Sequence, residues 1–223
     1  MKAKPIPKNL EKVFYLYPIV HLLLLGIAII WFIKSLSILS FACLAFISYL
    51  MSPLIWRLIQ RRYPLTYGFE KIGKKSQSGS LWMVSYQLQH LYNSYAVFEK
   101  VLKTFPEAYS AWLRLWGAKV GEKNNWTSGC EVVDRPYLSI GDRCLVGNKA
   151  YLSAHVIKKS NGNYILYTKP LELGSDIVLS FFVTIGPGIK IEDECFVEAG
   201  GTLYPNYHLK KGETYARYQE LSQ

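Results

Sequence analysis

Two long uncharged stretches occupy the beginning of the chain. The first runs from Val13 to Ile33 and the second from Ser35 to Trp56, with Lys34 between them. At about 1.5 Å per helical residue the first stretch would span roughly 31 Å, enough to cross the hydrocarbon core of a bilayer. The pattern predicts a transmembrane helical hairpin over residues 1–64. A re-entrant or surface-lying hairpin is the alternative interpretation.

Residues 65–116 have a mixed pattern that predicts a linker followed by amphipathic helices. The stretch 64–80 is rich in glycine and lysine, as expected of a linker. From Leu81 to Leu115 apolar residues recur every three or four positions, and Pro106 can begin a second helix. The aromatic residues of these helices suit either a membrane interface or packing onto the next domain.

A six-residue period governs the chain from about residue 117 onward. Each unit opens with a large apolar residue, a glycine often follows, and a small or apolar residue stands four positions after the opener. The openers are Val120, Trp126, Val132, Ile140, Val146, Leu152, Leu173, Leu179, Ile185, Ile191, Val197 and Leu203. One such unit is too short to bury its own apolar side, so the units must stack into a common core. The pattern predicts a parallel β-helix with three units in each triangular coil.

The register gives about four coils over residues 117–208, with a C-terminal tail at 209–223. It places the first two coils at 120–139 and 140–157, with Val156 as an inward residue. An insertion at 158–172 follows them, with a hairpin signal at Ser160-Asn161-Gly162-Asn163. Three of the four cysteines, Cys130, Cys144 and Cys195, fall at inward positions and are expected to be buried thiols.

Composition and charge narrow the class of protein. The 223 residues are 50% hydrophobic and 19% charged, which excludes a disordered chain or a coiled coil. The net charge of +10 is concentrated before residue 65, while the remainder is close to neutral, which argues against nucleic-acid binding. Basic residues precede the first apolar stretch and follow the second, so both ends are expected on the cytoplasmic side of the inner membrane. The β-helix would then face the cytoplasm.

The repeat units resemble a known family of enzymes. Two units, Ile140-Gly141-Asp142-Arg143-Cys144-Leu145 and Ile185-Gly186-Pro187-Gly188-Ile189, are typical of the left-handed β-helix, or hexapeptide-repeat, acyltransferases. The resemblance covers roughly the last hundred residues. A closer likeness is to the membrane-attached transferase-like domains at the tails of some nonribosomal peptide synthetases. Those domains also join apolar helices to a β-helix and place a histidine where Leu152-Ser153-Ala154-His155 has one.

This resemblance implies a homotrimer with an active site in each groove between neighbouring coils. The donor would be acetyl-CoA or another acyl-CoA, and His155, which matches the family's histidine, would deprotonate a hydroxyl or amine acceptor. An imidazole with a reference pKa near 6.5 suits that proton transfer at neutral pH. A surface histidine at a turn is the alternative. Asn148, one turn earlier, is a candidate substrate contact, although asparagine in such a turn is often structural.

Four further residues are candidate contacts to the donor. Ser180, Ala199 and Gly200 lie where small residues let a ligand approach, and backbone N–H groups at Ala199-Gly200 are candidates to hold the pantetheine arm or the thioester oxygen. Lys210 is a candidate for the CoA phosphates. The chain departs from the family at Phe181-Phe182, where glycines are common. These two rings would block the donor channel, line it for a long acyl chain, or pack against the membrane helices.

The sequence therefore predicts a membrane-anchored acyltransferase that acts on a small or lipid-linked acceptor, with no metal site. No cysteine pair or histidine cluster has metal-ligand spacing. Two alternatives remain open. One is a non-catalytic trimeric membrane scaffold, motivated by Phe181-Phe182. The other is a transferase supplied with an aminoacyl or peptidyl thioester by a carrier-protein partner.

Overall fold

The computed structural model describes residues 6–72, 80–160 and 162–216. They form two compact units, one comprising residues up to Thr66 together with Ile72–Phe98, the other comprising Tyr67–Lys71 and the chain from Glu99 onward.

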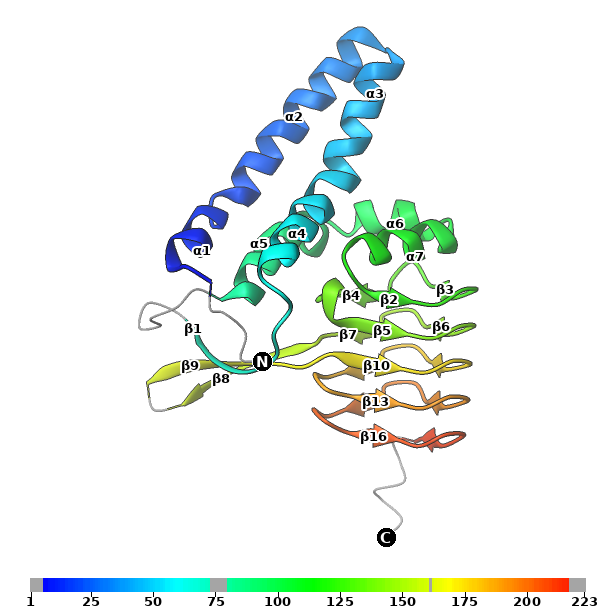
Figure 1. Cartoon of the computed structure of the whole chain (residues 1–223). Helices are drawn as coiled ribbons and strands as arrows, with labels where there is room; N and C mark the ends of the chain where they lie inside the picture. Colours follow the sequence, from blue (N-terminus) through cyan, green and yellow to red (C-terminus); the bar gives the residue numbers. More distant parts are fainter. Residues whose placement is uncertain (1–5, 73–79, 161, 217–223) are drawn as a thin grey trace. The chain divides into compact units, whose positions relative to one another are not determined.

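The first unit is a helical hairpin with one helix packed against it (Figure 1). Its elements are α1 (Lys8–Phe14), α2 (Tyr17–Ser35), α3 (Ile38–Ala45), a π-helical turn (Phe46–Leu50), α4 (Met51–Arg62) and α5 (Leu81–Ser94). The π-helical turn lies just before Pro53, which has no N–H to donate to the preceding turn. By length and composition, the helical stretches Lys8–Ser35 and Ile38–Arg62 could each cross a membrane, as the sequence predicts.

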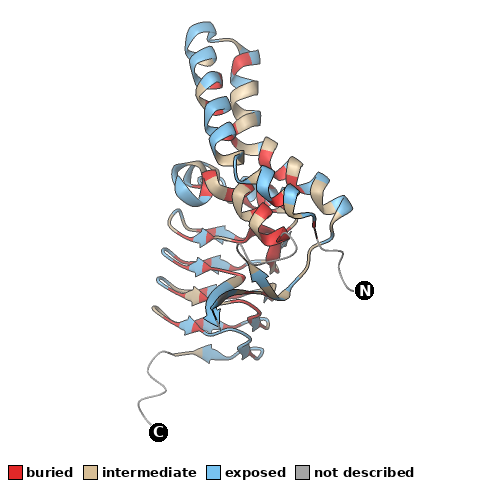
Figure 2. Ribbon diagram, turned by 90° about the vertical axis from the view of Figure 1, so that its left-hand side faces the viewer, coloured by how far each residue is buried: buried red, intermediate tan, exposed pale blue. Residues whose placement is uncertain are grey.

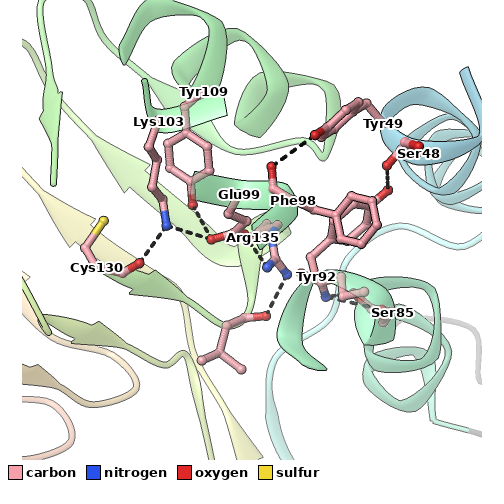
Figure 3. Close-up of polar contacts among 12 residues, drawn as sticks. Ser48, Tyr49, Ser85, Tyr92, Phe98, Glu99, Lys103, Tyr109, Cys130 and Arg135 are labelled. Atoms are coloured by element: carbon pink, nitrogen blue, oxygen red, sulfur yellow. Dashed lines mark hydrogen bonds and ion pairs between the residues drawn. The ribbon is translucent and has the colours of Figure 1, made fainter. Parts of the chain in front are cut away.

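Polar contacts join the helices of this first unit. His21 Nε2 lies 2.9 Å from the Ile47 carbonyl oxygen, and the Tyr17 hydroxyl lies 2.7 Å from Ser52 Oγ. On α5, the Tyr92 hydroxyl donates to the Ser48 carbonyl at 3.0 Å (Figure 3). These contacts give the named polar groups partners within the unit, whereas Trp56 Nε1 and Gln60 Oε1 on α4 are buried with no hydrogen-bond partner among the described residues.

The second unit is a three-sided parallel β-helix, as predicted (Figure 1). Its first face stacks β2 (Lys119–Val120), β5 (Leu138–Ile140), β10 (Leu171–Leu173), β13 (Lys190–Ile191) and β16 (His208–Leu209). The second face stacks β3 (Asn125–Trp126), β6 (Leu145–Val146), β11 (Val178–Leu179), β14 (Phe196–Val197) and β17 (Thr214–Tyr215). The third stacks β4 (Glu131–Val132), β7 (Tyr151–Leu152), β12 (Thr184–Ile185) and β15 (Thr202–Leu203).

The six-residue period has a direct physical cause in this β-helix. Successive side chains of a strand point to opposite sides, so one residue of each short strand faces inward. The unit openers are those inward residues: Val146, Leu179 and Val197 are buried, while the residues before them are exposed. Figure 2 shows buried and exposed positions alternating along the coils. The glycine after an opener lets neighbouring coils approach, because a Cβ on Gly147 would lie 2.5 Å from the Ser180 carbonyl oxygen.

Helices α6 (Val97–Lys103) and α7 (Pro106–Leu115) precede the β-helix. Helix α7 packs against β2 and β3 at the first coil. The Trp126 indole donates to Ser110 Oγ at 2.9 Å, and Trp112 and Trp116 are buried. Of the two interpretations of the aromatic residues, packing onto the following domain therefore holds for Trp112 and Trp116.

Three boundaries differ from those expected from sequence. The ladder continues beyond residue 208, because β16 and β17 pair with β13 and β14, so the β-helix extends to Tyr215. Leu209 and Tyr215 continue the six-residue period of the openers. The supposed linker contains a strand, β1 (Gly68–Ile72).

The insertion also begins earlier than expected. Strands β8 (His155–Ser160) and β9 (Asn163–Thr168) form an antiparallel hairpin, with β1 added beside β9. Val156 is therefore 40% exposed on this hairpin and is not an inward residue of the second coil. The predicted hairpin is confirmed in its described part; Asn161, at its turn, lies outside the described residues.

Candidate active site

His155 lies where the chain leaves the regular coil and enters the hairpin. It is the first residue of β8 and follows the turn Ser153-Ala154 after β7. Its side chain is 17% exposed, so the imidazole lies at the surface without being surrounded by solvent. The prediction that this histidine stands at the start of an excursion from the β-helix is confirmed.

A buried carboxylate contacts the imidazole. Asp134 Oδ2 lies 2.7 Å from His155 Nδ1, and the Asp134 side chain is only 3% exposed. The same oxygen accepts a hydrogen bond from the Ala154 backbone N–H at 2.8 Å. Because an ionised carboxylate only accepts hydrogen bonds, Nδ1 carries the proton in this pair and Nε2 carries the basic lone pair. Asp134 therefore fixes both the orientation and the tautomer of His155.

The Ser153 hydroxyl completes this arrangement. Its Oγ lies 3.2 Å from His155 Nδ1 and donates to the Asp134 carboxylate at 3.4 Å. Sequence reasoning identified His155 but missed Asp134. A signal was present, because the first coil carries extra residues at Asp134-Arg135-Pro136, where a loop can depart from the regular turn.

A buried ion cluster holds the loop that carries Asp134 (Figure 3). Arg135, the next residue, is 1% exposed and donates through Nε to Glu99 Oε1 at 2.8 Å; its Nη2 also contacts this oxygen. Lys103 Nζ donates to the other Glu99 oxygen at 2.8 Å and to the Cys130 carbonyl at 2.6 Å. The Tyr109 hydroxyl also donates to Glu99 Oε2, at 3.2 Å. Helix α6 is thereby tied to the Asp134 loop.

The charges within the cluster keep Glu99 ionised. Burial alone raises the pKa of the Glu99 carboxyl, but the positive charges and hydrogen bonds of Arg135 and Lys103 outweigh it, so the pKa lies below its ordinary value. Burial, with the adjacent Glu99 charge, raises the pKa of Tyr109 well above its ordinary value. The hydroxyl therefore remains a donor to the carboxylate.

Four of the predicted contact residues lie together at a different corner, between the second and third faces. Asn148 follows β6, Ser180 follows β11, and Ala199-Gly200 follow β14. Backbone hydrogen bonds link these turns: the Phe182 N–H donates to the Asn148 carbonyl at 3.0 Å, and the Gly200 N–H donates to the Phe181 carbonyl at 2.9 Å. The Gly200 N–H is therefore hydrogen-bonded between stacked turns. This corrects the expectation that it is available to hold the acyl donor.

The two phenylalanines project from this same corner. Phe181 and Phe182 are 54% and 61% exposed, and their ring centroids are 5.9 Å apart. Phe182 has φ +58°, in the left-handed region that residues other than glycine and asparagine rarely adopt. Lys149 and Gly200 have similar φ values in the neighbouring coils, so the stacking of turns imposes this conformation.

One chain does not bring all predicted residues together. His155 lies at the corner between the third and first faces, while Asn148, Ser180, Ala199 and Gly200 lie at the corner between the second and third. Lys210 lies at the remaining corner, where its backbone N–H donates to Glu213 at 2.8 Å. An active site that used His155 and the other residues at once would therefore need another copy of the chain.

No family model matches the sequence, and no curated protein matches it. Solved structures do match, and several are named as acetyltransferases. A maltose O-acetyltransferase from Clostridium difficile 630 is 19% identical, with 54% of this chain and 79% of that chain covered and a TM-score of 0.40. The hexapeptide-repeat acetyltransferase VCA0836 of Vibrio cholerae, complexed with acetyl coenzyme A, is 15% identical, with coverages of 61% and 84% and a TM-score of 0.44.

A third match is serine acetyltransferase 1 of Entamoeba histolytica in complex with L-cysteine. It is 11% identical, with 96% of this chain and 87% of that chain covered and a TM-score of 0.34. These names agree with the hexapeptide-repeat resemblance seen in the sequence.

Proposed function

We propose that the protein is a membrane-anchored acyltransferase in which His155 is the general base. The observation that carries the proposal is the Asp134–His155 pair, with 2.7 Å between Asp134 Oδ2 and His155 Nδ1. A carboxylate that holds the Nδ1 proton leaves Nε2 to accept a proton, which is the arrangement that general-base catalysis requires. The apolar helices Lys8–Ser35 and Ile38–Arg62 would provide the anchor, with the β-helix on the cytoplasmic side.

The proposed reaction transfers an acyl group from an acyl-CoA thioester to a hydroxyl or amine. His155 Nε2 takes the acceptor proton while the acceptor oxygen or nitrogen attacks the thioester carbonyl carbon. The new C–O or C–N bond forms, the C–S bond breaks, and the proton held on His155 passes to the departing thiolate. Asp134 stabilises the imidazolium that exists between these two proton transfers.

A homotrimer is part of the proposal. His155 and the donor candidates Ser180, Ala199 and Lys210 occupy different corners of one chain, so a donor that contacts all of them would lie between subunits. At the donor corner, the exposed Phe181 and Phe182 rings favour a donor with an apolar acyl chain over a short acetyl group.

Native mass spectrometry of the full chain, with acetyl-CoA and with a longer acyl-CoA, tests this proposal. A trimer that binds up to three donors is the expected result, with the longer acyl-CoA binding more tightly. Clean monomers would contradict a site between subunits. A trimer that binds neither donor would favour the second candidate, a scaffold or a transferase supplied by a carrier protein, for which the Phe181-Phe182 pair is the motivating observation.

A further inference from the structure

The hairpin that begins at His155 forms a small sheet with two different sides. Strand β1 lies beside β9, and β9 pairs with β8, so the order is β1-β9-β8 (Figure 1). Directly opposite residues of paired strands point to the same side, and successive residues alternate. The register therefore assigns each described side chain to one side or the other.

One side faces the candidate active site where the hairpin leaves the coil. His155 pairs with Thr168 and Ile157 with Leu166, and both β9 residues of these pairs are buried. The third pair on this side, Lys159 with Tyr164, lies toward the end of the hairpin and is exposed. The pKa of the Tyr137 hydroxyl is raised by burial, then by the charge of Asp134, and then by the charge of Glu70 on β1. Glu70 therefore lies near Tyr137. We call this the inner side of the sheet.

The opposite side, here the outer side, is apolar and basic, and its Tyr167 hydroxyl donates to Asn206 Oδ1 of the β-helix at 2.8 Å. Val156 pairs with Tyr167 and Lys158 with Ile165, while Phe69 stacks on Tyr167 with ring centroids 4.6 Å apart. Its described side chains are Phe69, Lys71, Val156, Lys158, Ser160, Ile165 and Tyr167, and none of these is acidic. Phe69 is 71% exposed, and Lys158 lies 5.9 Å from the centroid of its ring.

We propose that the outer side docks on an anionic lipid surface and so holds the His155 site at the membrane. Lysines beside exposed aromatic rings are the combination that binds the boundary between headgroups and acyl chains, and the absence of acidic groups among the described residues of this side gives charge complementarity to anionic lipids. The inference rests on the membrane anchoring in the proposed function. It adds a second membrane contact, made by the outer side of the hairpin that begins at His155.

The path of the chain supports a lipid surface as the occupant. Helix α4 ends at Arg62 and β1 begins at Gly68. The six residue-to-residue steps from Arg62 to Gly68 span at most about 22 Å, whatever the relative placement of the two units. A membrane-inserted α4 would therefore keep β1 within about this distance of the bilayer surface. The six-residue strands of the hairpin are themselves about 20 Å long, so the outer side can reach that surface.

Chemical labelling of lysines tests the docking directly. The full chain is placed in nanodiscs of phosphatidylcholine alone or mixed with phosphatidylglycerol, treated with an amine-reactive acetylating reagent, and read by peptide mass spectrometry. We expect the labelling of Lys71 and Lys158 to fall about fivefold or more in the anionic discs, the effect of one lysine held near an anionic surface. High salt should restore it. Lys119 and Lys190, exposed on the first face of the β-helix, are controls in the same sample.

The variants F69S and K158E should lose the protection of Lys71, whereas K119E should retain it. Continued protection of Lys103, which is only 6% exposed, would show that the β-helix unit of F69S is still folded. Equal labelling of Lys158 in both kinds of disc would overturn the proposal. Full protection already in lipid-free detergent would also overturn it, by showing that protein covers this side. Protection retained in H155A separates docking from catalysis, because the labelling does not depend on acyl transfer.

Discussion

Asp134 Oδ2 accepts from His155 Nδ1 at 2.7 Å across a turn of the β-helix, although the two residues are 21 positions apart in the sequence. The contact exists because parallel coils bring the turn after β4 against the turn after β7. A repeat fold that stacks its turns can therefore assemble an oriented histidine from two successive coils, without any local sequence motif that joins the pair.

The substitution D134N tests the role of this carboxylate. Asparagine keeps the size of the side chain but can present N–H to the imidazole, which favours the tautomer with the proton on Nε2. We expect acyl transfer to fall by about 10²-fold or more with the fold intact. Steady-state kinetics across pH measures it. The matched control is D193N, on an exposed turn, and an equal loss of activity in both variants would contradict a specific role for Asp134.

The ion cluster beneath the Asp134 loop predicts a large effect on stability. In E99Q the buried guanidinium of Arg135 would lose its countercharge, and uncompensated burial of a charge costs about 3–5 kcal/mol. The free energy of unfolding, from denaturant titration, should fall by that amount. The exposed pair Arg143–Asp176 provides the control, because D176N breaks a solvent-screened interaction and should leave stability unchanged. A similar small effect in both variants would refute the importance of the cluster.

The same carboxylate predicts a dependence of stability on pH. The pKa of Glu99 in the folded protein lies below its ordinary value of 4.5. A group with a lowered folded pKa stabilises the folded state above its unfolded pKa, and the contribution is lost as pH falls through the folded pKa. The difference in unfolding free energy between the native chain and E99Q should therefore be full above about pH 5 and shrink in acid. A difference in unfolding free energy that grew as the pH fell would contradict a lowered pKa of Glu99.

The β-helix cysteines should be unreactive in the folded protein. Cys130, Cys144 and Cys195 are buried free thiols, and burial raises the pKa of Cys130 and of Cys144 to about 11. A thiol with so high a pKa is protonated at neutral pH and is a poor nucleophile. Iodoacetamide followed by peptide mass spectrometry should modify none of the three until the protein is denatured. Rapid modification of Cys144 under native conditions would contradict the buried position.

The sequence predicted the β-helix well because its cause is local. The six-residue period alone identifies openers such as Val146 and Leu179 as buried residues. The glycine after an opener, such as Gly147, indicates that the next coil lies close. The same logic found His155 at the excursion. Strand β1 escaped prediction because Gly68–Ile72 is a strand only by pairing with β9, far away in sequence. The role of Asp134 could not be predicted, because a single carboxylate in a turn is not part of a repeated pattern. Its contact with His155 depends on how the coils stack.

The central claim, that His155 is the base of an acyl transfer, has a direct test. Thiol release from acetyl-CoA and from a longer acyl-CoA is followed with the full chain in nanodiscs, with a panel of hydroxyl and amine acceptors, for the native chain, H155A and H208A. His208 is an exposed histidine that contacts Glu192 on the first face of the β-helix, so H208A is a matched control. We predict acceptor-dependent thiol release in the native chain and in H208A, and a loss of at least about 10²-fold in H155A. Unchanged turnover in H155A would contradict the account.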